Sequence, residues 1–347
     1  MAMGSMLRKM IENAIEVNRS GDSSGNLRYR ESFPPQRQQR YTVCFRHPSE
    51  FVMFTRIDHV MICVPDLQQA TEQYRKLGFN MFAGGAHPGK GTHNAIALNN
   101  EDYLELIAVR DAAEYAASGK PGTWNTGLTD FVAAGGGIRF IAIQSDDLAA
   151  DVAAMRARGV DVGDATDGSR RTPAGLELKW KSAVLGAQNP LPLFFIQHVT
   201  PMAQRRQQMP VAGGHPNGVY TLERTYVVTR DVESAAAQYA KVLGLPQPKT
   251  VKGTVIMSDM SVFQLGEHGL GVVQPYADGP AADALQRRGP GPFQALYRTT
   301  SMGAAERWMQ AQGMPPLQKG VRNTGEVAML ATPADACGAY VGFVGPQ

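Results

Sequence analysis

The sequence predicts an α+β fold built from four copies of one unit, and two patterns support this prediction. A capping residue opens a short helix four times, and each helix ends in glycine. The four predicted helices span residues 66–78, 147–159, 231–244 and 301–313. A short apolar run precedes each helix, and strand-like runs separated by Gly, Asn, Asp and Pro follow it. Each unit is therefore expected to be a strand, a helix and about three further strands.

The first helix shows the design most clearly. Asp66, with Gln69 three residues later, makes a capping-box pair, and Gly78 ends the helix. Its apolar residues recur on one face, as in a helix that packs on a sheet: Leu67, Ala70, Tyr74 and Leu77. The other three helices repeat this stripe, so all four are expected to pack in the same way.

The strands are predicted from apolar or alternating runs. In the first unit they are residues 57–64, 92–98 and 102–109, and in the second 138–143, 176–182 and 191–199. In the third unit they are residues 225–229, 255–260, 261–266 and 270–275, and in the fourth 295–298, 325–332 and 339–345. A curved sheet of a few strands with one helix leaves its concave face uncovered, so two units are expected to pair around one cavity.

Length and composition describe a globular chain. The 347 residues are 43% hydrophobic and 8% aromatic, which is enough apolar material for two domains of ordinary size. No apolar run reaches the roughly 18 residues of a membrane span, and no signal peptide is recognised, so a cytoplasmic protein without membrane partners is expected. The three cysteines are far apart in the sequence and are expected to be reduced thiols.

Charge and composition also distinguish an N-terminal extension from the rest of the chain. Residues 1–52 hold eight Lys or Arg and five Asp or Glu, which accounts for the net charge of +3, and they are expected to be a mostly disordered extension. The remainder is neutral, so a small molecule rather than nucleic acid is the expected partner, and a homodimer stays open. The polar residues 202–218 predict a linker between a first domain at 53–201 and a second, structural or dimerising domain at 219–347.

The repeated and paired order of one strand, one helix and three strands resembles the vicinal oxygen chelate superfamily. This superfamily includes glyoxalase I, extradiol dioxygenases, methylmalonyl-CoA epimerase and bleomycin resistance proteins. The segments IDHVMICVPDL, GGAHPGKGTHNAIAL and YLELIAV resemble its glyoxalase-like branch in particular. The resemblance implies two barrel-like domains, each made of two units. It leaves the reaction open, because the scaffold hosts lyases, isomerases, dioxygenases and ligand-binding proteins.

His59 and Glu105 are the candidate catalytic residues. In the resembled superfamily, metal ligands come from the first and last strands of a unit, so the resemblance implies a metal-binding or catalytic role for this pair. The sequence adds an independent argument, because Glu105 lies among apolar residues on a strand. A lone carboxylate is costly to bury there without a cation or hydrogen-bond donors. At the matching positions the third unit carries Arg224 and Gly271 instead.

A complete metal site would need further ligands from the second unit. The repeat places Phe140 opposite His59, and Phe194 or Phe195 opposite Glu105. The ligand sets of glyoxalase I and of an extradiol dioxygenase are therefore both incomplete, unless one of three histidines substitutes: His93, His87 or His198. One divalent metal, Zn, Ni, Mn or Fe, is expected if the site is completed, and no cofactor is expected otherwise.

Three further residues are expected to bind substrate. Strand alternation turns Thr92 and Asn94 into the cavity and His93 away from it, although a bulge would make His93 a candidate metal ligand. His87 lies in the glycine-rich stretch AGGAHPGKG, which is interpreted as a mobile rim over the cavity.

Two functions fit this pattern. The first is a glyoxalase-like enzyme of the lyase or isomerase type, in which Glu105, with a metal or alone, abstracts a proton next to a carbonyl of a small oxygenated substrate. In this hypothesis His59 binds the metal or orients Glu105, and Asn94 holds the substrate oxygen. A dioxygenase is less favoured. The alternative is a metal-free binding protein of the bleomycin-resistance type, with Phe140 and Phe195 as an apolar wall.

Overall fold

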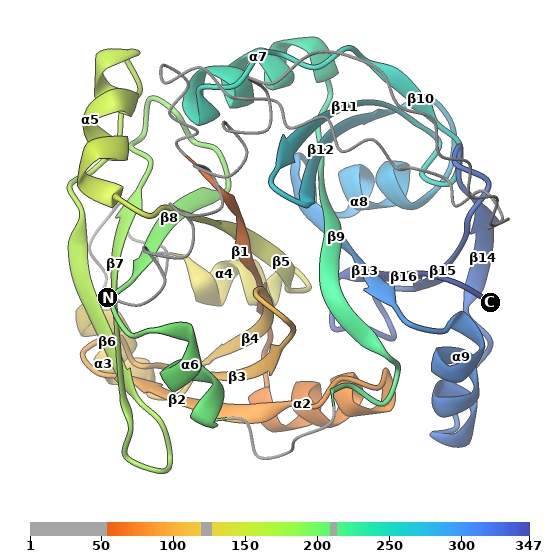
Figure 1. The fold of residues 1–347 in the computed structure, drawn as a ribbon, viewed down its shortest axis with the longest axis horizontal. Helices are drawn as coiled ribbons and strands as arrows, with labels where there is room; N and C mark the ends of the chain where they lie inside the picture. The colour runs from red at the N-terminus through yellow and green to blue at the C-terminus, as the bar shows by residue number, and fades with distance from the viewer. Residues whose placement is uncertain (1–53, 119–126, 209–213) are drawn as a thin grey trace, which may run out of the picture. The chain divides into compact units, whose positions relative to one another are not determined.

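The computed structural model describes residues 54–118, 127–208 and 214–347, all within one compact unit (Figure 1). The predicted N-terminal extension, residues 1–52, lies outside the described residues. The expected α+β fold with four repeated units is confirmed. The division into domains at residues 53–201 and 219–347 stays a prediction.

All four units follow the predicted order of elements. The first contains β1 (Arg56–Cys63), α2 (Leu67–Lys76), β2 (Phe82–His87), β3 (Thr92–Leu98) and β4 (Tyr103–Val109). The second contains β5 (Gly137–Gln144), α5 (Leu148–Ala157), β6 (Thr166–Arg171), β7 (Glu177–Val184) and β8 (Leu193–His198). The third contains β9 (Val219–Val228), α7 (Val232–Leu243), β10 (Val251–Gly253), β11 (Ser258–Leu265) and β12 (His268–Pro275). The fourth contains β13 (Gly291–Thr299), α9 (Met302–Ala311), β14 (Gln318–Val321), β15 (Val327–Ala331) and β16 (Tyr340–Val344).

The four helices are capped as the sequence predicts. A side-chain oxygen at each N-cap accepts a hydrogen bond of 3.0 to 3.2 Å from the backbone N–H three residues later, in Asp66, Asp147, Asp231 and Ser301. The glycine after each helix has a φ between +67° and +88°, the left-handed region that glycine adopts without strain. These glycines are Gly78, Gly159, Gly244 and Gly313.

Some elements escaped the sequence analysis. Each unit has a short second strand, and β2 runs through the glycine-rich stretch that was expected to be a rim. Hydrogen bonds to the neighbouring strand outweigh its low β propensity. In the described residues, further α-helices and one 3₁₀-helix, η1 (Arg206–Gln208), connect the strands; the α-helices are α3 (Ala112–Ser118), α4 (Leu128–Ala133), α6 (Met202–Arg205) and α8 (Pro280–Arg288). Helix α6 lies at the start of the predicted linker, of which residues 209–213 are outside the described residues.

The first two units close into one barrel, in the order β1-β4-β3-β2-β6-β7-β8-β5. β1 pairs in parallel with β4 of its own unit and antiparallel with β5 of the other unit. On the opposite side, a bridge between Ala86 and Arg171 joins β2 to β6. The third and fourth units form a second sheet, in the order β10-β11-β12-β9-β13-β16-β15-β14, which stays open between β10 and β14 in the described part of the chain.

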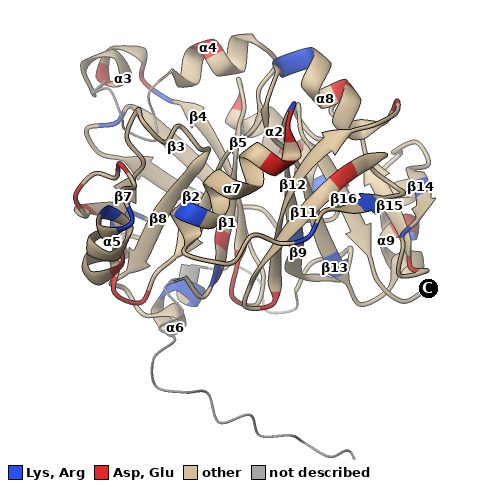
Figure 2. Ribbon diagram, turned by 90° about the horizontal axis from the view of Figure 1, so that it is seen from above, with Lys and Arg blue, Asp and Glu red and all other residues tan. Residues whose placement is uncertain are grey.

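Apolar side chains from both sheets and the capped helices form the main core. A separate cluster fills part of the barrel interior, with Met61 from β1, Ile107 from β4, Phe194 from β8 and Leu128 from α4 among its members. The remaining interior holds the polar residues described below. Acidic and basic residues are both scattered over the described ribbon in Figure 2. None of the helices in the described residues is long and apolar enough to cross a membrane.

The helix caps give a first prediction. Substitution of Asp231→Ala removes the acceptor for the Ser234 N–H and should lower the free energy of unfolding by about 1 kcal/mol. Urea unfolding followed by circular dichroism measures this. Asp167→Ala, at an exposed position of β6, is the control and should change the stability little. Equal losses in the two variants would contradict the role of the cap.

Candidate functional site

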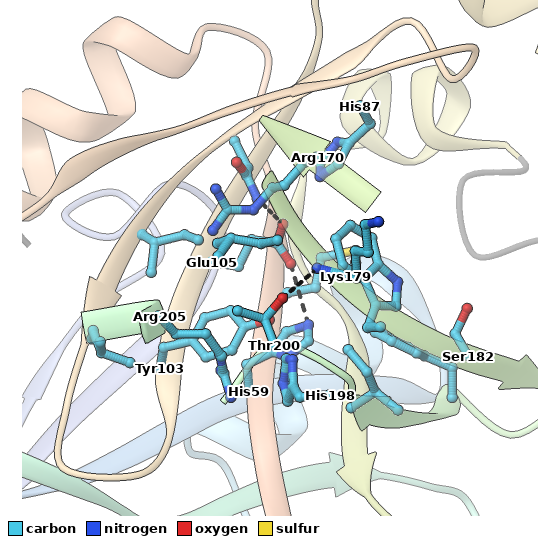
Figure 3. Close-up of a pocket in the computed structure, with 18 residues that line it drawn as sticks. His59, His87, Tyr103, Glu105, Arg170, Lys179, Ser182, His198, Thr200 and Arg205 are labelled. Carbon is cyan, nitrogen blue, oxygen red and sulfur yellow. Dashed lines mark hydrogen bonds and ion pairs between the residues drawn. The ribbon is translucent and has the colours of Figure 1, made fainter. Parts of the chain in front are cut away.

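A cavity lies inside the barrel, and Figure 3 shows the side chains that line it. Eight of them carry a charged, imidazole or amide group: His59, His87, Asn94, Glu105, Arg170, Lys179, His198 and Arg205. Apolar and aromatic side chains form much of the remaining wall: Met61, Ile96, Leu98, Leu178, Trp180, Phe194 and Ile196. An apolar cavity with a few converging polar groups is typical of a small-molecule site.

A β-bulge in β1 brings two neighbouring titratable residues together. The register of β1 against β5 shifts between Ile57 and His59. Strict alternation would send Asp58 and His59 to opposite faces, but Asp58 Oδ1 lies 2.8 Å from His59 Nδ1. Asp58 is therefore a site residue that strand alternation alone does not predict. The available signal was a second titratable residue within an otherwise apolar strand.

His59 stands between two carboxylates. Its Nδ1 faces Asp58, and its Nε2 lies 3.2 Å from Glu105 Oε2. Ionised carboxylates only accept hydrogen bonds, so both ring nitrogens must carry protons and the ring is an imidazolium. Burial opposes this charge, but the hydrogen bonds to Asp58 and Glu105 outweigh it and raise the pKa of His59. Tyr103 stacks on the ring, with 4.2 Å between the ring centroids.

Glu105 is a buried carboxylate with two donors. Its side chain is only 5% exposed; Asn94 Nδ2 donates to Oε1 at 2.6 Å, and His59 Nε2 faces Oε2. Burial raises the pKa of Glu105, but the hydrogen bond and charge of His59 outweigh it, and the net pKa lies below the ordinary value. Glu105 is thus ionised at neutral pH. Gly84 leaves room for this arrangement, because a Cβ there would lie 2.1 Å from Asn94 Oδ1.

His198 extends the chain of hydrogen bonds on the far side of Asp58. Its Nε2 lies 2.9 Å from Asp58 Oδ2. Burial outweighs the attraction of Asp58 and lowers the pKa of His198, so this ring is neutral and must carry its proton on Nε2. Although burial opposes ionisation of Asp58, the two histidines hold its pKa well below the usual range. Along this series of contacts the order of the residues is Glu105, His59, Asp58 and His198.

The donor set was tested against a metal ion. His59 Nε2 and Glu105 Oε2 converge, and the hydrogen bond of Nδ1 to Asp58 is of the kind that orients metal-binding histidines. Catalytic metal sites usually have three protein ligands. In residues 54–118, 127–208 and 214–347, no group of three His, Cys, Asp or Glu side chains could hold an ion. The described donors therefore do not fit a three-ligand site, and no step below passes through a metal.

His87 and Thr92 differ from the expectations, whereas His93 faces away from the cavity as strand alternation predicts. His87 is not on a mobile rim: it is buried in β2, with Nδ1 2.9 Å from Thr92 Oγ1, and burial lowers its pKa to about 4. Thr92 contacts His87 but does not line the cavity. His93 alternates away from the cavity on β3, with its backbone paired to Ala108, so it cannot complete a metal site with His59 and Glu105.

The aromatic wall also differs from the expectation. Phe194 lines the cavity and meets the His59 ring edge-on, with 5.4 Å between the centroids. Phe195 was expected there, but alternation along β8 turns it into the core, where it stacks on Phe54 at 4.7 Å. Phe140 contacts Phe194 but does not line this cavity either.

Two buried arginines were missed. Arg170 from β6 and Arg205 from α6 are each 6% exposed and line the cavity. Arg170 donates from Nη1 to the carbonyl of Gly84, and the Arg205 guanidinium lies 5.8 Å from the centre of the Tyr103 ring. Arg205 belongs to a stretch that was interpreted as a linker because of its polar composition. Only the fold brings it to the barrel.

The second sheet has no acidic residue at the position that corresponds to Glu105. Glu105 pairs with Met61 in the barrel, and Gly271 pairs with Tyr226 at the corresponding place in the second sheet. Likewise, Arg224 takes the place of His59. The register therefore agrees with the sequence comparison of the units, and the described buried His–Glu pair lies in the barrel.

Comparisons with known proteins agree with this fold. The model of the family described as glyoxalase-like domain matches residues 57–243. A hypothetical protein from Staphylococcus aureus superposes with a TM-score of 0.59 at 13% identity, over 83% of this chain and 98% of the other. A mutant of 4-hydroxymandelate synthase from Streptomyces coelicolor superposes with a TM-score of 0.57 at 14% identity, over 84% of this chain and 93% of the other.

A third structure is a fusion of a xylose isomerase-like TIM barrel with a 4-hydroxyphenylpyruvate dioxygenase. It superposes with a TM-score of 0.53 at 11% identity, over 87% of this chain and 50% of the fusion. Comparison with curated proteins finds no match. At these identities the structural neighbours establish the fold alone, the vicinal oxygen chelate fold that the sequence resemblance implied.

The ion pair predicts a pH dependence of stability. The raised pKa of His59 adds stability that is complete below its ordinary value of 6.5 and is lost as the pH rises through the folded-state pKa. The lowered pKa of Glu105 adds stability above its ordinary value of 4.5, lost as the pH falls through the folded-state pKa. The pair should therefore stabilise the fold most between about pH 5 and 6.5.

The measurement is urea unfolding of the wild type and Glu105→Gln at pH 6 and pH 9. The variant keeps Asp58 beside His59 but loses the second carboxylate, so the pKa of His59 is raised less. The stability difference between the two proteins should be larger at pH 6 than at pH 9. A difference that does not change with pH would show that His59 is not charged beside Glu105.

Proposed function

The chain belongs to the glyoxalase-like domain family, and from this premise we propose that it is an enzyme that moves a proton on a small carbonyl compound, with Glu105 as the base. The observation that carries the proposal is the buried carboxylate of Glu105, kept ionised by His59 and facing a cavity. An ionised carboxylate that faces a cavity can accept a proton from carbon.

The reaction step involves one proton and one electron pair. Glu105 takes a proton from the carbon next to the carbonyl group, and the electron pair of the broken C–H bond moves to the carbonyl oxygen as an enolate. Return of the proton to a neighbouring atom completes an isomerisation. Loss of a leaving group from the next carbon completes an elimination instead. Cationic side chains that line the cavity, including Lys179 and Arg170, can stabilise the negative charge of the enolate.

The residues that are linked to Glu105 by hydrogen bonds and ion pairs hold its carboxylate in position. Asn94 and His59 each hold one oxygen of the Glu105 carboxylate, which fixes its plane. Asp58 fixes the His59 ring, and His198 fixes Asp58. Asn94 is therefore assigned to orienting Glu105 rather than to the substrate oxygen. When the proton reaches Glu105, its attraction to the His59 imidazolium weakens. Return of the proton restores that attraction and regenerates the base.

A binding protein of the bleomycin-resistance type is the second candidate. Trp180, Phe194 and Ile196 give the cavity an apolar and aromatic side that would suit an aromatic ligand. In that case Glu105 would accept hydrogen bonds from water or from a hydrogen-bond donor of the ligand. No proton would pass between Glu105 and a carbon atom of the ligand.

Exchange of carbon-bound hydrogen in D₂O tests the proposal. The probes are hydroxyacetone, butanone, 2-oxobutanoate and its neutral amide, followed by proton NMR. The wild type should exchange the hydrogens next to the carbonyl of at least one probe. Glu105→Gln should slow that exchange by about 100-fold or more, since an amide cannot accept the proton.

Asp167→Asn makes the same carboxylate-to-amide change on the exposed face of β6 and should exchange at the wild-type rate. Equal exchange by Glu105→Gln and the wild type would refute the role of Glu105. Probes that bind to the wild type and to Glu105→Gln without any exchange would favour the binding protein.

A further inference from the structure

Arg205 is the most unusual group at the cavity. It is 6% exposed, lines the cavity and has its guanidinium over the Tyr103 ring. With the other described residues its side chain forms no hydrogen bond and no ion pair, although the charge of Asp58 attracts it. No described protein acceptor therefore occupies its planar group of donors, and this group matches the oxygens of a carboxylate.

The charged side chains around the cavity also favour an anionic ligand. Five buried side chains carry a charge there: Asp58, His59, Glu105, Arg170 and Arg205. With His59 as an imidazolium, three cations face two carboxylates. Lys179, with a side chain that is 57% exposed and paired to Glu177, adds a further cation at the outer edge. Of these cations, the Arg205 side chain forms no ion pair with the described residues, so an incoming anionic group would be attracted to it.

The position of Arg205 suits a small molecule. Its guanidinium lies on one side of Tyr103, whose ring stacks on His59. Figure 3 shows Arg205 beside Tyr103 and His59, with Arg170 on the other side of Glu105. A group bound to Arg205 therefore lies in the same cavity as the Glu105 carboxylate.

We propose that the ligand of this cavity is a small carboxylic acid with a carbonyl group next to its carboxylate, and that Arg205 binds the carboxylate. This inference rests on the proposed function only in placing the carbonyl group next to Glu105. Arg205 determines specificity, because a neutral ketone or aldehyde has no carboxylate to accept charge-assisted hydrogen bonds from the guanidinium.

Binding of 2-oxobutanoate and of its neutral amide, 2-oxobutanamide, tests the inference. The two probes have nearly the same shape and differ by one charge. Titration of the full chain, followed by tryptophan fluorescence, to which Trp180 in the cavity wall contributes, and by calorimetry, gives both dissociation constants. The acid should bind about tenfold or more tighter than the amide, because charge-assisted hydrogen bonds are roughly twice as strong as neutral ones.

Three variants separate the contributions. Arg205→Gln should weaken binding of the acid about tenfold or more and leave binding of the amide nearly unchanged. Arg205→Lys keeps the charge and should retain part of the preference. Arg206→Gln removes the neighbouring, exposed arginine and should bind like the wild type. Circular dichroism melting of each variant shows whether it is folded.

The outcomes distinguish this inference from the proposed function. Equal binding of acid and amide, no binding of either, or unchanged acid binding in folded Arg205→Gln would overturn the inference. If a neutral carbonyl compound still exchanges its hydrogens in a Glu105-dependent way, the proposed function survives that result. Conversely, Arg205-dependent binding of the acid without hydrogen exchange would support the inference and count against the proposed function.

Discussion

The site depends on the buried imidazolium of His59, whose Nδ1 faces Asp58 and whose Nε2 faces Glu105. Two carboxylates would repel each other in the barrel if the histidine between them were neutral. With the imidazolium in place, each carboxylate has a charged donor, and both remain ionised although they are buried. Removal of one member of a buried ion pair typically costs about 3–5 kcal/mol, because it leaves an uncompensated charge. Asn94 and His198 then have fixed partners, since they hydrogen-bond the outer oxygens of the two carboxylates.

The closed barrel makes this arrangement possible because each unit supplies a different part. The first unit supplies His59 from β1 and Glu105 from β4, which are neighbouring parallel strands. The second unit supplies His198 from β8 and Arg170 from β6, and Arg205 follows in α6. A single unit would expose its concave face to water, and the ion pair would be weakened by solvent. Pairing of the units thus gives both the apolar wall and the low dielectric in which the charges interact strongly.

Much of the fold was accessible from the sequence because its signals are local. A capping residue, an apolar stripe and a terminal glycine lie within about 13 residues of each other, and four copies reinforce the interpretation. His59 and Glu105 could be predicted because a titratable group is unusual on an apolar strand. The family resemblance also implies that these strand positions carry metal-binding or catalytic residues. The short strands β10 and β14 were missed, since pairing with neighbours rather than composition forms them.

The rest of the site depends on tertiary structure. The bulge at Asp58 breaks the alternation from which side-chain directions were inferred, and it joins Asp58 to His59. The placement of Phe194 instead of Phe195 depended on a register that the sequence left open between two adjacent residues. Arg205 comes to the cavity from a polar stretch with no periodic pattern, so local analysis assigned it to a linker. Long-range contacts of this kind carry no local signal.

The central claim is that His59 is doubly protonated and keeps Glu105 ionised. Nitrogen-15 NMR of the imidazole rings tests it most directly, because protonated and unprotonated ring nitrogens have well-separated chemical shifts. With His59→Gln used to assign the signals, the account predicts that both nitrogens of His59 carry protons at pH 7, while His198 has one protonated and one unprotonated nitrogen. A neutral His59 ring at pH 7, with a free or metal-bound Nε2, would contradict the account.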